Sequence, residues 1–110
     1  MDLKQFGRPI KRGSANVWKR GEPVRGKLYL LERALVHQQE GYHLRPEPVI
    51  IALADIKEVV YKNYFGVLPN GLVIYLKDGD QYTLVVNRRK HWMSAIAAQC
   101  KNLNSDVKPL

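Results

Sequence analysis

One long stretch with helical spacing, near the end of the chain, most constrains the fold. It spans residues 87–103 (NRRKHWMSAIAAQCKNL). Apolar residues recur there every three or four positions and predict an amphipathic helix, with Asn87 as its N-cap. The predicted stripe comprises Trp92, Ile96, Cys100 and Leu103, widened by Met93 and Ala95. A single helix after a run of strands predicts a sheet or open barrel that the helix plugs.

The chain before this helix has the pattern of short strands separated by turns. Apolar and β-branched runs predict seven strands, over residues 14–20, 25–31, 34–38, 49–53, 56–64, 72–77 and 81–86. In the fifth of these, Ile56 and Val59 are three positions apart, which indicates a bulge or a short turn. Residues 39–48 and 65–71 are expected to be loops.

The last two predicted strands flank an Asp78-Gly79 pair, which first suggests a two-residue hairpin turn. Such a turn would set Leu76 opposite Gln81 and so place apolar residues against polar ones. A three-residue loop over residues 78–80 instead pairs Leu76 with Tyr82, Ile74 with Leu84 and Leu72 with Val86. Because a slip of one residue turns a whole strand over, we expect the three-residue loop.

Composition limits the chain to one modest core. It has 110 residues, of which 45% are hydrophobic, and a formal net charge of +8. The charge is uneven: residues 1–27 carry a net +6, residues 28–87 a net −2 and residues 88–110 a net +4. Such basic ends attract anionic lipid, nucleic acid or an acidic protein face. The alternative is that the charge serves solubility alone.

The predicted organisation is a single domain with two extensions. Residues 1–13 are expected to form a basic flexible arm, residues 14–103 the domain, and residues 104–110 a flexible tail. Cys100 is the only cysteine, so no intramolecular disulfide is possible. The longest apolar run, residues 49–54, is too short to span a membrane, and the start of the chain lacks the apolar region of a secretory signal. A cytoplasmic protein is the expectation, with peripheral membrane association as its extension.

Several segments, in order, resemble the pattern of the GRAM domain and of bacterial pleckstrin-homology-like domains. In that pattern a GxLYLT…RLVF hairpin is followed by IPLxDIxxV, by DGxxYxF and by a helix that opens with NR. The matching segments are residues 26–30 (GKLYL), 33–36 (RALV), 51–59 (IALADIKEV), 77–79 (KDG) and 87–92 (NRRKHW). Leu31, Ala52 and Leu84 depart from it, standing where the pattern has Thr, Pro and Phe.

The resemblance extends over roughly residues 14–99, most of the chain. It implies a mainly β fold of the pleckstrin-homology (PH) type. In this fold a seven-stranded, partly open β-barrel or sandwich is capped by one C-terminal helix. It also implies a non-catalytic binding module. Some members associate with membranes or phosphoinositides, others contact proteins, and many bacterial relatives have no assigned ligand.

The first candidate site is a set of basic residues around the first turn: Lys19, Arg20, Arg25 and Lys27. Phosphoinositide-binding PH domains place basic residues around this loop. Here the last position is Lys27, which binds phosphate as a point charge and not as a bidentate fork. The alternative is a solvated edge, since any basic hairpin satisfies the pattern.

Two further candidates are weaker. Phe65, Val67 and Leu68 are a possible interaction loop that enters a bilayer or meets a protein, although we favour a loop folded back over the core. Arg88 and Arg89 open the predicted helix, where free amides attract anions. The alternative, which we favour, is that these side chains simply reach water.

No motif for catalysis or cofactor binding is present in the sequence. His37, His43 and His91 are scattered and have no cysteine or carboxylate at ligand spacing, so no metal site and no cofactor are predicted. The leading hypothesis is a non-enzymatic module that contacts anionic membrane lipid through a basic rim. The second is a protein-interaction or self-assembly module. The third is weak, non-specific nucleic-acid binding through the basic ends, without a recognisable reading module.

Overall fold

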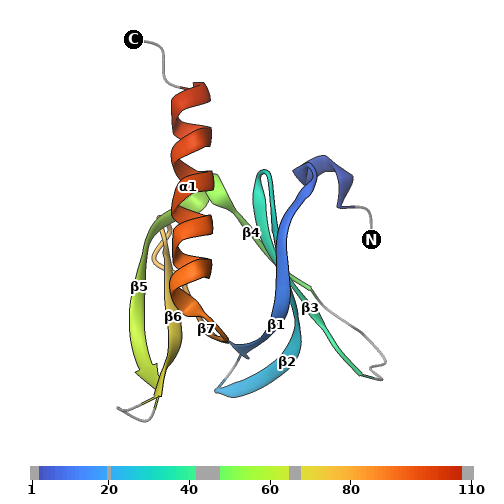
Figure 1. The fold of residues 1–110 in the computed structure, drawn as a ribbon, viewed down its shortest axis with the longest axis vertical. Helices are drawn as coiled ribbons and strands as arrows, with labels where there is room; N and C mark the ends of the chain where they lie inside the picture. The colour runs from blue at the N-terminus through green and yellow to red at the C-terminus, as the bar shows by residue number, and fades with distance from the viewer. Residues whose placement is uncertain (1–2, 20, 42–47, 65–67, 108–110) are drawn as a thin grey trace.

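The computed structural model describes residues 3–19, 21–41, 48–64 and 68–107 (Figure 1). Within them it forms seven strands, two short 3-10 helices and one long helix. In chain order these are η1 (Lys4–Phe6), β1 (Pro9–Lys19), β2 (Glu22–Leu31), β3 (Ala34–Gln39), β4 (Val49–Ala52), η2 (Leu53–Asp55), β5 (Ile56–Tyr64), β6 (Leu68–Leu76), β7 (Gln81–Val86) and α1 (Arg89–Val107).

All seven strands belong to one antiparallel sheet. Its order is β4-β3-β2-β1-β7-β6-β5, so β1 lies in the middle, between β2 and β7. The edges are β4 and β5, and the sheet is therefore not closed into a barrel. Figure 1 shows α1 standing against the curved sheet, with its last turns extending past the strands. The predicted architecture of seven strands and one C-terminal helix is confirmed.

The main core lies between the inner face of the sheet and α1. Alternate strand residues point inward and are buried, as the period of two requires. The buried members are Ala15, Val17, Leu28, Leu30, Leu35, Val49, Ile51, Leu53, Leu72, Ile74, Leu84, Val86, Trp92 and Ile96. The predicted helix stripe is confirmed, because Met93, Ala95, Cys100 and Leu103 also pack against this cluster. Full burial of a side chain such as Ile96 stabilises the fold by roughly 1.5–3 kcal/mol.

Three strands begin earlier than the apolar pattern predicts. β2 starts at Glu22 and not at residue 25. β1 starts at Pro9 and not at residue 14, and β6 starts at Leu68 and not at residue 72. Residues 9–13 are largely polar, but Lys11 pairs with Leu30 and Gly13 with Leu28 through the backbone. Ladder hydrogen bonds do not require an apolar side chain on both strands. Part of the expected arm therefore belongs to the sheet.

The β6–β7 hairpin has the predicted three-residue loop, one position earlier than expected. The Leu76 amide donates to the Asp80 carbonyl at 2.8 Å, and Ile74 pairs with Tyr82. Gly79 has φ 98°. A three-residue hairpin loop places its left-handed residue last, so Gly79 ends a loop over residues 77–79. The predicted cross-strand partners were wrong by two residues. Because side chains alternate with a period of two, such a shift keeps the same residues on the inward face.

The start of α1 also differs from its prediction. The helix begins at Arg89, and the amides of His91 and Trp92 donate to the carbonyl of Arg88 at 2.9 and 3.3 Å. Arg88 has φ 55°, in the left-handed region. The residue that precedes the first helical position is thus Arg88, and the prediction of Asn87 as N-cap was wrong. In β5, the predicted irregularity is confirmed by a register shift between Ile56 and Glu58.

Candidate functional site

The antiparallel order brings basic residues from three distant segments to one end of the sheet. The β1–β2 hairpin, the end of β5 and the start of α1 all lie at the lower end of Figure 1. We call this the basic end; its described side chains are Arg25, Lys27, Lys62, Arg88, Arg89 and Lys90. The turns at the opposite end carry the acidic residues Glu32, Asp55, Asp78 and Asp80 together with the basic Arg33 and Lys77, whereas Glu22 and Glu40 lie at the basic end. The fold therefore gathers cations from segments that are far apart in the sequence.

A shallow polar depression lies on the outer face of the sheet beside the basic end. Its volume is about 410 Å³, within the size range of small-molecule sites. It is lined by Ser14, Ala15, Asn16, Arg25, Glu40, Val85 and Asn87. Asn16 pairs with Arg25 and with Val85, so the depression is built where β1 meets both of its neighbours. A hydroxyl, two amides, a guanidinium and a carboxylate are thereby brought together.

Lys27 is the best-connected cation beside this depression. Its ammonium donates to the Ser14 hydroxyl at 3.1 Å and lies 3.7 Å from a Glu40 carboxylate oxygen. Both ends of the ion pair are partly exposed, so it contributes at most about 1 kcal/mol. The pair nevertheless matches the positive charge of Lys27 with a nearby carboxylate.

Arg25 differs from Lys27 although the two share the outer face of β2. It is exposed, and its side chain makes no hydrogen bond or ion pair with a described residue. Its planar guanidinium can grip a phosphate or carboxylate with two parallel hydrogen bonds. Of Arg25 and Lys27, Arg25 therefore has the more available cationic group. Lys19 pairs with Glu22 in the ladder, and Arg20 lies outside the described residues.

Arg88 and Arg89 are adjacent in sequence but point to different surroundings. The Arg89 guanidinium donates to the carbonyls of Lys62 at 3.0 Å and Gly71 at 3.4 Å, and stacks on Tyr61. Its donors thus join the helix to β5 and β6. Arg88 is exposed. The structure does not bring the two arginines together as one anion site.

The predicted interaction loop is described only in part. Phe65 and Val67 lie outside the described residues, whereas Leu68 opens β6 and is 47% exposed. Leu68 therefore does not fold back over the core. Tyr61, from the same end of the sheet, is also 47% exposed. Two large apolar side chains thus lie in the open near the basic end.

Several residues of the site had no signal in the sequence. Asn16, Glu40 and Asn87 line the depression only because β1 pairs with β7 and because β3 ends beside β2. Lys62 joins the basic end through the length of β5. Each follows from long-range pairing, which no local motif records.

The remaining candidate groups, namely the histidines, Cys100 and the helix, show no sign of a second site in the described part of the chain. Within the described residues, no group of three or more His, Cys, Asp or Glu side chains could hold a metal ion. His37 is 2% exposed and its Nε2 lies 2.9 Å from the Ala15 carbonyl oxygen, so this nitrogen carries the proton. Burial raises the pKa of the Cys100 thiol. No helix among the described residues is long and apolar enough to cross a bilayer.

Solved structures match the fold at low sequence identity. The Vps36 N-terminal PH domain aligns with a TM-score of 0.76 and 14% identity over 94% of this chain and 86% of that domain. The C-terminal domain of an unknown protein from Leishmania infantum aligns with a TM-score of 0.73 and 16% identity, over 84% of each chain. The Slm1-PH domain aligns with a TM-score of 0.66 and 13% identity, over 84% of this chain and 97% of that domain.

These matches establish the fold. Seven antiparallel strands in an open sheet, with one C-terminal helix, form a PH-like domain, as the sequence predicted. No family model and no curated protein matches the chain. Membership of the GRAM branch or of the bacterial relatives stays a prediction.

Proposed function

We propose that this chain is a non-catalytic binding module that contacts an anionic membrane surface through its basic end. The observation that carries the proposal is the concentration of basic side chains at one end of the sheet. These side chains come from β2, β5 and the start of α1, which are far apart in the sequence. Such a field orients the domain toward negative charge. Each basic residue near an anionic membrane contributes about 1 kcal/mol.

The depression on the outer face offers a place for a head group. The Arg25 guanidinium, which has no side-chain partner among the described residues, supplies a bidentate donor, and the amides of Asn16 and Asn87 add neutral donors. Lys27 is less available, because Glu40 already faces it at 3.7 Å. Lys19 and Arg20 stay predicted members of the binding surface, because their side chains lie outside the described part of the structure.

Exposed apolar side chains at the same end support a membrane over a free anion. Tyr61 and Leu68 are each 47% exposed. Amphipathic and apolar side chains of this kind partition into the interfacial region of a bilayer. A surface that is both basic and locally apolar suits lipid better than nucleic acid.

The second candidate, a protein-interaction or self-assembly module, is favoured by the two open edges. β4 and β5 each present one unpaired side, and β5 is nine residues long. An extended peptide or a second copy can add a strand to such an edge. Two register shifts in β5 weaken its use as a template, so we place this candidate second.

Co-sedimentation with vesicles tests the proposal. Phosphatidylserine-containing and neutral vesicles are compared at low and at moderate salt, with Arg25→Ala as the variant. Lys101→Ala, which removes an exposed charge far along α1, is the matched control. Salt-sensitive binding, weakened about fivefold by Arg25→Ala and unchanged in the control, is the expected result. Absence of binding to anionic vesicles even at low salt would sink the proposal.

The same samples separate the alternatives. A mass that rises with concentration in sedimentation, without vesicle binding, supports self-association. An oligonucleotide mobility shift that survives physiological salt supports nucleic-acid binding.

A further inference from the structure

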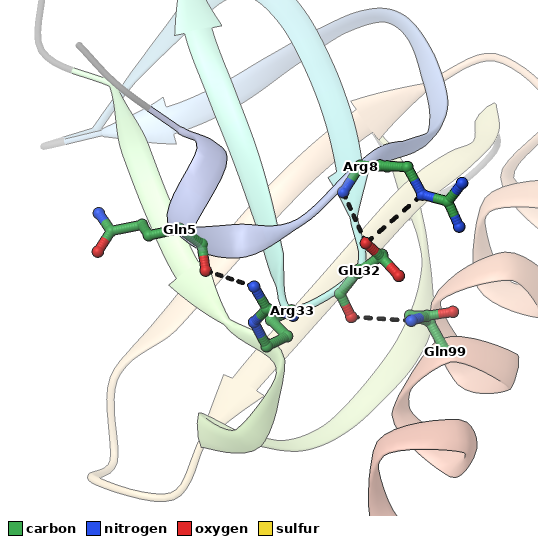
Figure 2. A network of polar contacts seen from close by, with 5 residues as sticks. All are labelled: Gln5, Arg8, Glu32, Arg33 and Gln99. Atoms are coloured by element: carbon green, nitrogen blue, oxygen red, sulfur yellow. Dashed lines mark hydrogen bonds and ion pairs between the residues drawn. The ribbon is translucent and has the colours of Figure 1, made fainter. Parts of the chain in front are cut away.

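Residues 3–8, here called the strap, lie at the end of the sheet opposite to the basic end (Figure 1), and Figure 2 shows their polar contacts with the β2–β3 turn. They comprise Leu3, η1, Gly7 and Arg8. Beneath them is a second apolar cluster, separate from the main core: Leu31, Ala34 and Val36 are at most 3% exposed. Leu3 and Phe6 of the strap pack against it, together with Tyr29. The strap thus covers a small apolar surface of β2 and β3.

The strap is held mainly through its own backbone. The amides of Arg33 and Glu32 donate to the carbonyls of Phe6 at 2.9 Å and Arg8 at 3.1 Å. The Arg33 guanidinium donates to the Gln5 carbonyl at 2.6 Å, and the Arg8 amide donates to the Glu32 carboxylate at 2.8 Å. These four bonds do not depend on which side chains stand at residues 5 and 8. Backbone hydrogen bonds with a few anchoring side chains are a common way in which proteins recognise peptides.

Gly7 adds a sequence requirement to this mode of binding. Its φ is 89°, and a Cβ at this position would lie 2.6 Å from the Cβ of Glu32. Only glycine therefore fits between the anchor Phe6 and Arg8. The surface selects two apolar side chains three positions apart, followed directly by glycine.

The surface beneath the strap is held in place by the rest of the fold and not by the strap. The turn at Glu32 and Arg33 is the β2–β3 connection, and Gln99 of α1 donates to the Glu32 carbonyl at 2.8 Å (Figure 2). The strap itself is attached by exposed polar contacts and by two partly buried anchors. Segments with few buried contacts open at low free-energy cost, well below global unfolding. When the strap detaches, the apolar side chains of Leu31, Ala34 and Val36 become exposed to water. A ligand that covers them again is therefore bound favourably.

We propose that this surface is a peptide-binding site that the strap occupies in cis. The site consists of Tyr29, Leu31, Ala34, Val36 and the turn at Glu32 and Arg33. Its partner is a segment of another protein with the pattern apolar-x-x-apolar-Gly, which displaces the strap. The site lies at the end of the sheet away from the basic end, so peptide and membrane can be bound together.

The test uses a labelled synthetic peptide with the sequence of residues 2–9 (DLKQFGRP) as the probe. It is titrated against the full chain and against the full-chain variant Gly7→Ala. This variant strains the strap but leaves the surface beneath it unchanged. Because the cis strap competes with the probe, we expect the variant to bind the peptide about tenfold more tightly than the unmodified chain does. Amide shifts at Leu31, Ala34 and Val36 should report the contact.

Altered peptides serve as the controls for specificity. A peptide carrying Phe6→Ser should show no saturable binding, and one carrying Gly7→Ala should bind about tenfold more weakly. The full-chain double variant Leu3→Ser/Phe6→Ser releases the strap by a second route, in case Gly7→Ala does not fold. Vesicle binding of both variants should match that of the unmodified chain, which separates this site from the proposed membrane contact.

Two results would overturn the proposal. One is a folded strap variant that does not bind the peptide at millimolar concentration, or that binds the Gly7→Ala peptide equally well. The other is a concentration-dependent dimer of the Gly7→Ala chain that the peptide dissociates, because the partner would then be a second copy of this chain.

Discussion

The guanidinium of Arg89 lies 4.5 Å from the centre of the Tyr61 ring. The same group donates to the backbone carbonyls of Lys62 in β5 and Gly71 in β6. The first turn of α1 is thereby joined to the strands at the β5 edge of the sheet. From the sequence, Arg89 is a candidate anion ligand. In the structure its Nη1 group already donates to two carbonyls, and its role is to hold the helix against the strands.

Loss of Arg89 should therefore affect stability more than membrane binding. Arg89→Ala is expected to lower the free energy of unfolding by about 1–2 kcal/mol, since it removes a cation–π contact and a hydrogen bond. Lys90→Ala, an exposed neighbour with the same charge, is the control and should leave stability nearly unchanged. Urea denaturation measures both; equal losses in the two variants would contradict this role.

Gly26 is required where β2 lies close beside β3 in the sheet. A Cβ there would collide with the Gln38 carbonyl oxygen and would lie 2.7 Å from the Cε1 atom of His37. Gly26→Ala should lower the free energy of unfolding by about 2–4 kcal/mol, because the buried ring and the backbone must both shift. Gly13→Ala is the matched change: its Cβ would lie 3.2 Å from Trp92. Thermal unfolding should show the larger loss for Gly26→Ala, and the reverse order would refute the packing argument.

Glu40 should limit the membrane affinity of the basic end. Glu40→Gln removes the carboxylate that faces Lys27 at 3.7 Å, so the affinity for anionic vesicles should rise by up to about fivefold. Glu58→Gln removes the same charge from an exposed position of β5, outside the depression. A rise of equal size in both variants would show that only net charge matters.

Cys100 should make stability fall at alkaline pH. Burial raises the pKa of its thiol above the ordinary value of 9.0, and nearby Lys77 lowers it in part. As the pH rises, the thiol of the unfolded chain loses its proton before the thiol of the folded chain does. The contribution of the protonated thiol to folding stability is therefore complete below about pH 9 and is lost as the pH rises through the folded-state pKa. Urea denaturation of the unmodified chain and of Cys100→Ala, at about pH 8 and about pH 10, isolates the thiol. A pH dependence identical in the two proteins would exclude this contribution.

The helix and most strands were predictable because their signals are local. The alternation in residues 81–86 and the spacing from Trp92 to Leu103 each record which side of one element is buried. The bounds of β5 agree with the prediction, and so does its irregularity after Ile56. The starts of β1 and β6 could not be predicted from the sequence. Pro9 and Leu68 join the sheet through backbone pairing, which does not require an apolar pattern of side chains.

The candidate site was predictable only along one strand. Arg25 and Lys27 are two residues apart, so a strand places both on one face, and the structure has them on the outer face of β2. The partners that decide what they can do come from elsewhere: Glu40 follows β3, and Asn87 follows β7. Those neighbours depend on strand order and register, which no short segment specifies.

The sequence alone determined the types of the elements, the inward faces, the helix stripe around Trp92 and Ile96, and a strongly basic balance. Only the tertiary structure decided which charges share an end, that Arg89 is held by Lys62 and Tyr61, and that Leu3 and Phe6 cover a second apolar cluster. The physical reason is one of range. Burial on one face follows from the period of side chains within an element, whereas neighbours across a sheet are set by backbone pairing between segments far apart in the chain.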